Sequence, residues 1–63
     1  MTRYEKDFRN ALGTMLDKVV HSFGHESKEA IRMARTVEKY ENYCCYQSWN
    51  DCEAVFNSIM RRA

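Results

Sequence analysis

The apolar residues in the first third of the chain recur at steps of three and four, which is the period of one helix face. Thr2 followed by Glu5 is a capping box, in which each side chain can satisfy the other residue's backbone N–H. Gly24 suits the left-handed position that commonly ends a helix. The pattern therefore predicts a first helix ending at Phe23. Its apolar face carries Tyr4, Phe8, Ala11, Leu12, Met15, Leu16, Val19, Val20 and Phe23.

Gly13 lies inside this predicted helix, where glycine costs about 1 kcal/mol relative to alanine. We expect Gly13 to mark a close approach by another helix. A second helix begins near Ser27, which is a favourable N-cap, with Glu26 and Glu29 near the positive end of the helix dipole. Its expected buried stripe is thin. It consists of Ala30, Ala34, Val37 and Cys44, with Ile31, Met33 and Tyr40 at its flanks.

Residues 46–50 leave two alternatives open. Ser48 would cap a third helix over Trp49–Arg62, with acids in its first turn and arginines in its last. However, no glycine or proline marks a break, and Cys52 and Ile59 continue in phase with the second helix, so one long helix is also allowed. We favour an all-α helical hairpin whose second arm bends or breaks near residues 46–48, giving two to three helices.

The length of 63 residues limits the chain to one small helical domain, residues 1–63. A net charge of +1 and 13% aromatic residues argue against disorder and against a surface that is basic throughout. No stretch approaches the roughly 18 apolar residues of a membrane span, and charged residues interrupt the start where a secretory signal would lie. We therefore expect a cytoplasmic protein that does not bind membranes.

Three cysteines, Cys44, Cys45 and Cys52, form a poor disulfide framework because the count is odd and two of them are adjacent. Reduced thiols in a cytoplasmic protein are the simpler interpretation. We expect Cys44 and Cys52 to be small core residues and Cys45 to be partly exposed. Neither a disulfide nor a metal then supports so small a core, so we expect a homodimer.

The sequence lacks the patterns of an enzyme or of a cofactor site. His21 and His25 do not combine with the cysteines into the spacing of a zinc site, and we expect no metal and no cofactor. No glycine-rich loop or nucleophile signature is present, so no catalytic residue is assigned. A redox sensor based on the three thiols is a minor alternative.

A row of cations follows the second predicted helix at steps of four, three and four: Lys28, Arg32, Arg35 and Lys39. At about 100° per residue the four lie within about 60° of one another, opposite the apolar stripe. Such a row is often just a solvated surface, here with Glu29 and Glu38 nearby. It also has the chemistry to contact phosphates or an acidic protein surface.

Aromatic residues recur at every third position from residue 40 to residue 49: Tyr40, Tyr43, Tyr46 and Trp49. On a continuous helix this row would rotate by about 60° at each step, so it cannot face one core. Tyrosine and tryptophan are frequent anchors of protein interfaces. We expect Tyr43 and Tyr46 to lie towards the basic row, although covering gaps in a thin core would also account for these rings.

The length of the chain, its Thr2–Glu5 opening and the central Tyr43-Cys44-Cys45-Tyr46 run resemble small early accessory proteins of the exo–xis region of lambdoid phages. The resemblance implies an accessory protein that acts inside the bacterial host. Such proteins commonly bind a host protein and shift host physiology towards phage development. No functional motif is carried over by the resemblance.

These observations together favour a non-enzymatic interaction protein that modulates a host factor and pairs with a second copy of itself. Tyr43, Tyr46 and Trp49 would supply anchors for the partner. Arg32, Arg35 and Lys39 would supply electrostatic steering. The alternative is a small nucleic-acid-associated regulator that uses the same basic helix face.

Overall fold

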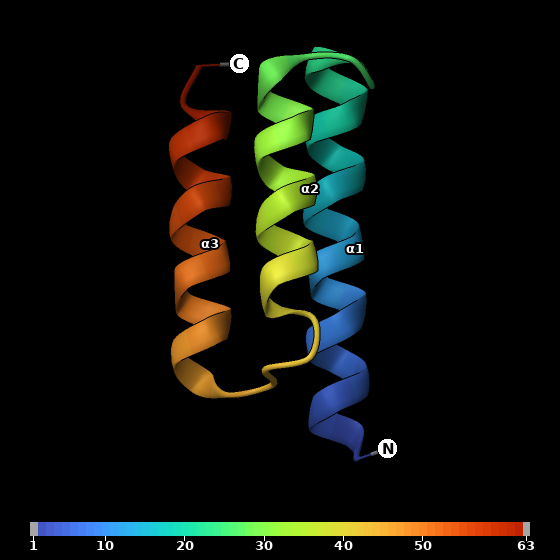
Figure 1. Cartoon of the computed structure of the whole chain (residues 1–63), viewed down its shortest axis with the longest axis vertical. Helices are drawn as coiled ribbons and strands as arrows, with labels where there is room; N and C mark the ends of the chain where they lie inside the picture. The colour runs from blue at the N-terminus through green and yellow to red at the C-terminus, as the bar shows by residue number, and fades with distance from the viewer. Residues whose placement is uncertain (1, 63) are drawn as a thin grey trace.

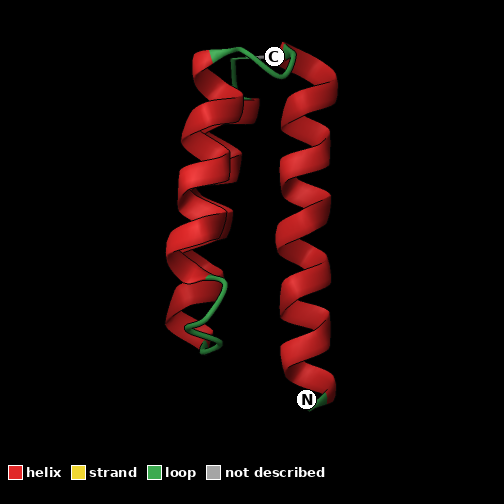
Figure 2. Cartoon of the chain, turned by 45° about the vertical axis from the view of Figure 1, so that its right-hand side comes forward, coloured by secondary structure: helices red, strands yellow, loops and turns green. Residues whose placement is uncertain are grey.

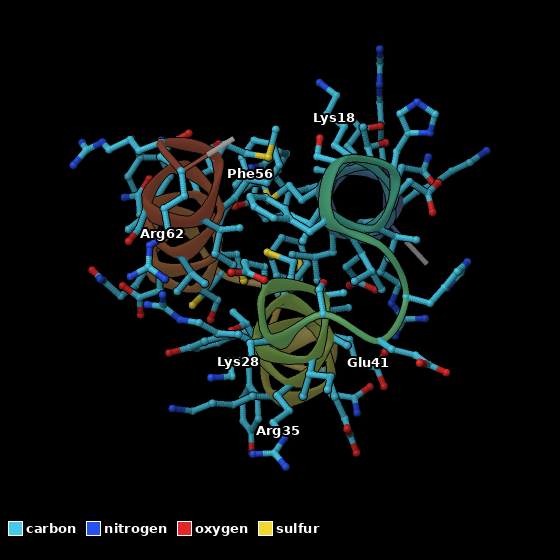
Figure 3. All side chains as sticks on the ribbon, turned by 90° about the horizontal axis from the view of Figure 1, so that it is seen from above. Lys18, Lys28, Arg35, Glu41, Phe56 and Arg62 are labelled. Atoms are coloured by element: carbon cyan, nitrogen blue, oxygen red, sulfur yellow. The ribbon has the colours of Figure 1, made fainter. Side chains whose placement is uncertain are left out.

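A computed structural model describes residues 2–62 and contains three helices over that range. They are α1 (Arg3–Phe23), α2 (Lys28–Tyr40) and α3 (Tyr46–Met60). The helices run up, down and up along a common long axis (Figure 1). Viewed along that axis they stand at the corners of a triangle, so every helix contacts the other two (Figure 3). The all-α prediction is confirmed, with the second arm of the hairpin broken into two helices.

The first helix begins and ends where its sequence predicts. The Glu5 N–H donates to Thr2 Oγ1 at 3.2 Å, which is half of the expected capping box. Gly24 has a φ of 95°, a backbone conformation that favours glycine, and its N–H donates to the Val20 carbonyl at 2.8 Å. The expectation for Gly13 is wrong, because a Cβ added there would meet no heavy atom of a neighbouring helix within 4 Å.

Ser27 caps α2 and fixes the turn that precedes it. Its hydroxyl accepts from the Ala30 N–H at 3.1 Å and donates to the Gly24 carbonyl at 2.8 Å. The buried stripe of α2 differs from the predicted one, because Met33 is fully buried and Ala34 is exposed. Because α2 contacts both α1 and α3, its buried arc is turned towards Met33.

The break between α2 and α3 lies at residues 41–45, before the predicted segment 46–48 (Figure 2). Cys45, not Ser48, is the N-cap of α3, so this helix begins three residues earlier than the predicted start at Trp49. Ser48 is instead buried in the first turn. The chain reverses here because reversal lets Cys52 and Ile59 pack against the first two helices, whereas a continuous arm would leave them uncovered.

The core lies on the axis between the three helices. Among residues 2–62, eight hydrophobic residues are buried: Phe8, Leu12, Met15 and Val19 from α1, Ala30 and Met33 from α2, and Cys52 and Ile59 from α3. Burying a large apolar side chain contributes roughly 1.5–3 kcal/mol each. Partly buried residues close the sides, among them Phe56, which lies between α3 and α1 in the view down the bundle (Figure 3).

Candidate interaction surfaces

The outer face of α2 carries a basic ridge formed by Lys28, Arg32, Arg35 and Lys39. All four side chains are exposed. With a rise of about 1.5 Å per residue, the ridge extends about 16 Å along the helix. Arg35 points away from the other two helices (Figure 3). The predicted basic row is therefore on the surface, as its position opposite the apolar stripe requires.

One exposed apolar residue borders this ridge. Ile31 keeps 47% of its surface accessible and lines a shallow depression together with the four cations and Thr36. The rotation of α2 that buries Met33 also turns Ile31 outwards. The sequence stripe placed Ile31 at the flank of the core, so its contribution to this outer surface was not foreseen.

The Lys39 ammonium lies over the Tyr40 ring, with 5.2 Å between Nζ and the ring centroid. The Tyr40 hydroxyl in turn donates to Asp51 Oδ2 on α3. These two contacts link Lys39, at the C-terminal end of the ridge, to α3 through Tyr40. Tyr40, the first member of the aromatic row, therefore has a structural position beneath the ridge.

Trp49 forms an aromatic cluster between α1 and α3. Its ring lies 5.5 Å from the Tyr4 ring and 5.7 Å from the Phe8 ring, with interplanar angles of 54° and 55°. Such tilted pairs add about 0.5–1.5 kcal/mol beyond the area that they bury. Trp49 is half-buried, so in the isolated chain it closes the side of the core as well as lining a surface.

The aromatic row is not one surface, because the break after α2 divides it. Tyr43 lies in the connection between α2 and α3 and is 67% exposed. Tyr46, at the start of α3, is 77% exposed and lines a depression with Tyr4 and Trp49. The structure thus groups Tyr46 and Trp49 with α1, on a different surface from Arg32, Arg35 and Lys39.

Tyr4 belongs to this aromatic surface although sequence analysis placed it on the core face. It is 42% exposed, and its phenol pKa is raised by desolvation and by the neighbouring Cys44, Cys45 and Tyr46. A signal was available in the sequence: Tyr4 and Phe8 are four residues apart, which places both rings on one side of α1. What the spacing does not give is that Trp49 packs against both.

A second depression continues from the aromatic cluster along the seam between α1 and α3. Ala11, Thr14, Met15 and Lys18 line it on the α1 side, and Trp49, Glu53, Phe56 and Asn57 line it on the α3 side. Trp49 and Glu53 line both depressions, so the two adjoin, and we call them together the α1–α3 groove. Its lining combines apolar side chains with opposite charges, Lys18 from α1 and Glu53 from α3.

The three thiols differ in their surroundings. Cys45 is exposed, and its Sγ lies 3.2 Å from Ser48 Oγ. The Ser48 hydroxyl holds the pKa of the Cys45 thiol below its ordinary value. Burial, together with the Glu5 carboxylate, raises the pKa of the half-buried Cys44 thiol.

Cys52 is fully buried, and burial raises the pKa of its thiol to about 11. Cys52 is a core residue, as expected from the sequence, whereas Cys44 is only half-buried against the core and Cys45 is exposed rather than partly so. All three are free cysteines. Over residues 2–62, no three His, Cys, Asp or Glu side chains gather in a group that could hold a metal ion.

None of the described helices combines the length and the apolar character that crossing a membrane requires. Comparison of the chain with protein-family models, with curated proteins and with solved structures finds no match. The chemistry of its own surfaces is therefore the basis for a functional proposal.

Proposed function

We propose that this protein is a non-enzymatic interaction protein, an early phage accessory factor that binds and modulates a protein in the cytoplasm of its bacterial host. The observation that carries the proposal is the basic ridge on the outer face of α2. Four exposed cations lie on one face of α2 although the net charge of the whole chain is only +1, so positive charge is concentrated there. A concentrated positive strip accelerates encounter with an acidic partner and disfavours basic ones.

The exposed phenols of Tyr43 and Tyr46 support an interaction role at a second place on the molecule. Large rings with few rotatable bonds lose little entropy when a partner covers them. Residue chemistry and exposure therefore favour partner-binding roles for Tyr43, Tyr46, Trp49, Arg32, Arg35 and Lys39. The resemblance to exo–xis region proteins supports the same class of function.

Affinity capture tests the proposal. The tagged protein is incubated with bacterial lysate, with and without nuclease, and bound proteins are identified by mass spectrometry. We expect at least one host protein that survives nuclease and is lost when Arg32→Glu and Arg35→Glu are combined. The matched control combines Arg3→Glu and Lys6→Glu, which reverses two exposed cations at the start of α1.

Two outcomes would contradict this function. Capture that disappears with nuclease would favour the alternative, a nucleic-acid-associated regulator, whose binding would also weaken steeply as salt rises. Equal loss of capture in the ridge variant and in the α1 control would point to general charge rather than to a site.

We also propose that two copies of the chain pair through the α1 flank of the groove. Asp7, Ala11, Thr14 and Lys18 follow one another at steps of four, three and four on one face of α1, and the last three line the groove. In an antiparallel pair, Asp7 of each copy would face Lys18 of the other, with the small Ala11 and Thr14 at the centre. This self-complementary pattern is what a two-fold interface requires.

Molar mass measured across a dilution series tests the pairing. We expect twice the chain mass at micromolar concentration and above. Lys18→Asp alone should weaken the dimer, and adding Asp7→Lys should restore it, because the swapped charges again oppose each other. A mass of about 7.5 kDa at every concentration would contradict the dimer.

A further inference from the structure

We propose that the basic ridge on α2 is a docking surface for an acidic amphipathic helix of a partner protein, with Ile31 as its apolar contact. This inference rests on the proposed interaction function and specifies the chemistry of the partner. It concerns the outer face of α2, away from the α1–α3 groove.

The ridge has the length and the direction of a helix-sized site. Its four cations follow the α2 axis for about 16 Å, which corresponds to about three helical turns. A partner helix lying along it would present carboxylates at the same steps of four, three and four. Each carboxylate would then meet a cation, and the arginines can bind a carboxylate through two N–H groups at once.

Ile31 makes the site amphipathic. Lining the same depression as the four cations, it keeps 47% of its surface accessible. An apolar side chain on the edge of an acidic helix would cover Ile31 and remove that surface from water. A sugar–phosphate backbone would bring charged oxygens to the same place, so Ile31 favours a protein over a nucleic acid.

The acidic residues on either side of the ridge also favour a narrow partner. With about 100° between successive residues, Glu38 lies on one side of the cations, near Ile31, and Glu29 lies on the other. A partner helix with a diameter of about 10 Å is no wider than α2 itself, so it can lie along the cations without covering both flanks. A nucleic-acid duplex is wider, and its phosphates would be brought towards Glu38 and Glu29. The two acids therefore act against a broad polyanion.

The probe for this proposal is a labelled helical peptide of about 18 residues, long enough to span the ridge. It carries Glu at positions i, i+4, i+7 and i+11 and Leu beside the second Glu. A peptide of the same composition in scrambled order, and a duplex DNA of similar length, are compared at the same salt concentration. Binding to the full-length protein is followed by fluorescence anisotropy, and the contacted residues are mapped by amide chemical shifts.

We expect the ordered peptide to bind at least about tenfold more tightly than the scrambled peptide and the DNA, because only its carboxylates match the ridge. Shift changes should be largest on α2 over residues 28–39. Combining Arg32→Glu with Arg35→Glu should weaken binding at least about tenfold. Exchanging the two central Glu of the peptide for Lys should restore it. Ile31→Ala should weaken binding by about threefold to tenfold.

Variants with Arg3→Glu and Lys6→Glu should bind the ordered peptide as the unmodified chain does. The proposal is overturned if the ordered peptide does not bind, if the scrambled peptide or the DNA binds as tightly, or if reversal of the ridge leaves affinity unchanged. A host protein whose nuclease-resistant capture is insensitive to the ridge variant would leave the interaction function standing and remove this docking site. If no host protein survives nuclease treatment but the ordered peptide still binds, the docking site stands and the proposed interaction with a host protein is contradicted.

Discussion

The hydroxyl of Tyr40, the last residue of α2, donates a hydrogen bond to Asp51 Oδ2 on α3 at 3.3 Å. The other carboxylate oxygen of Asp51 accepts from the Gln47 side-chain amide at 2.9 Å. The Tyr40 contact joins the two helices on either side of the break, whereas the Gln47 contact lies within α3 and orients the Asp51 carboxylate. The Tyr40 contact therefore holds the short connection between the helices closed at its base.

Removing that hydroxyl should therefore loosen the α2–α3 connection. We expect Tyr40→Phe to lower the free energy of unfolding by about 0.5–1.5 kcal/mol, the usual net contribution of one hydrogen bond. Urea denaturation measures the difference. Tyr43→Phe is the control, because that ring is exposed in the connecting loop, and it should change stability by less than about 0.5 kcal/mol. Equal effects of the two substitutions would contradict a role for the Tyr40–Asp51 contact.

The two glycines should respond in opposite directions to alanine. Gly13→Ala should stabilise the chain by about 0.5–1 kcal/mol, since it lies within α1 and its added Cβ meets no neighbouring helix. Gly24→Ala should destabilise it by about 1–2 kcal/mol, because its φ of 95° suits few L-residues. Both values come from urea midpoints. A loss of stability at Gly13 would show that its face is covered in solution.

Isoleucines at two depths offer a second matched pair. Ile59 is fully buried, so Ile59→Val should cost about 0.5–1.5 kcal/mol of unfolding free energy. Ile31 is about half exposed, and Ile31→Val should change stability by less than about 0.5 kcal/mol. Thermal or urea unfolding of the two variants checks the assignment of core and surface. If the two substitutions lowered the free energy of unfolding equally, Ile31 would be covered in solution, and the outer face of α2 would not be an exposed surface.

The thiols should react in order of their surroundings. Cys45 is exposed and its pKa lies below its usual value because the Ser48 hydroxyl supports the thiolate, so iodoacetamide should modify it first near neutral pH. Cys52 should react only when the chain unfolds. Mass spectrometry of the peptides gives the rates. Ser48→Ala should raise the pKa of Cys45 and slow its modification, while leaving Cys44 little changed.

Stability should fall in alkali because of Cys52. Its pKa is raised from 9.0 to about 11, so folding favours the protonated thiol. The resulting stabilisation is complete below pH 9 and is lost as pH rises through about 11. Urea midpoints recorded across this range should decline for the unmodified chain and decline less for Cys52→Ala. The same slope in both proteins would assign the loss to another group.

The first helix was predictable because its capping residues and its apolar period agree. Thr2 and Gly24 mark its two ends, and Phe8, Leu12, Met15 and Val19 all lie on the face that the period selects. The second helix was less predictable because it contacts two neighbours. Its period identified a stripe but not the rotation that buries Met33 and exposes Ala34.

The break after α2 lacks a local signal. Residues 41–45 contain neither glycine nor proline, and no side-chain hydrogen bond of Cys45 to the backbone caps α3. Burial of Cys52 and Ile59 in the bundle decides the reversal, and that is a property of the whole fold. The ridge could be placed from helix phase alone, whereas the aromatic row could not, because the break divides it between Tyr43 and Tyr46.

Trp49 is the one tryptophan of the sequence, and it stands where α3 meets α1. Indole emission responds to the polarity around the ring and to energy transfer from nearby tyrosine. The chain thus contains its own fluorophore at the junction between its first and last helices. Separation of α3 from α1, or coverage of the neighbouring groove, would alter the emission while the helical content stays constant. The unlabelled protein can therefore report opening of the bundle separately from melting of its helices.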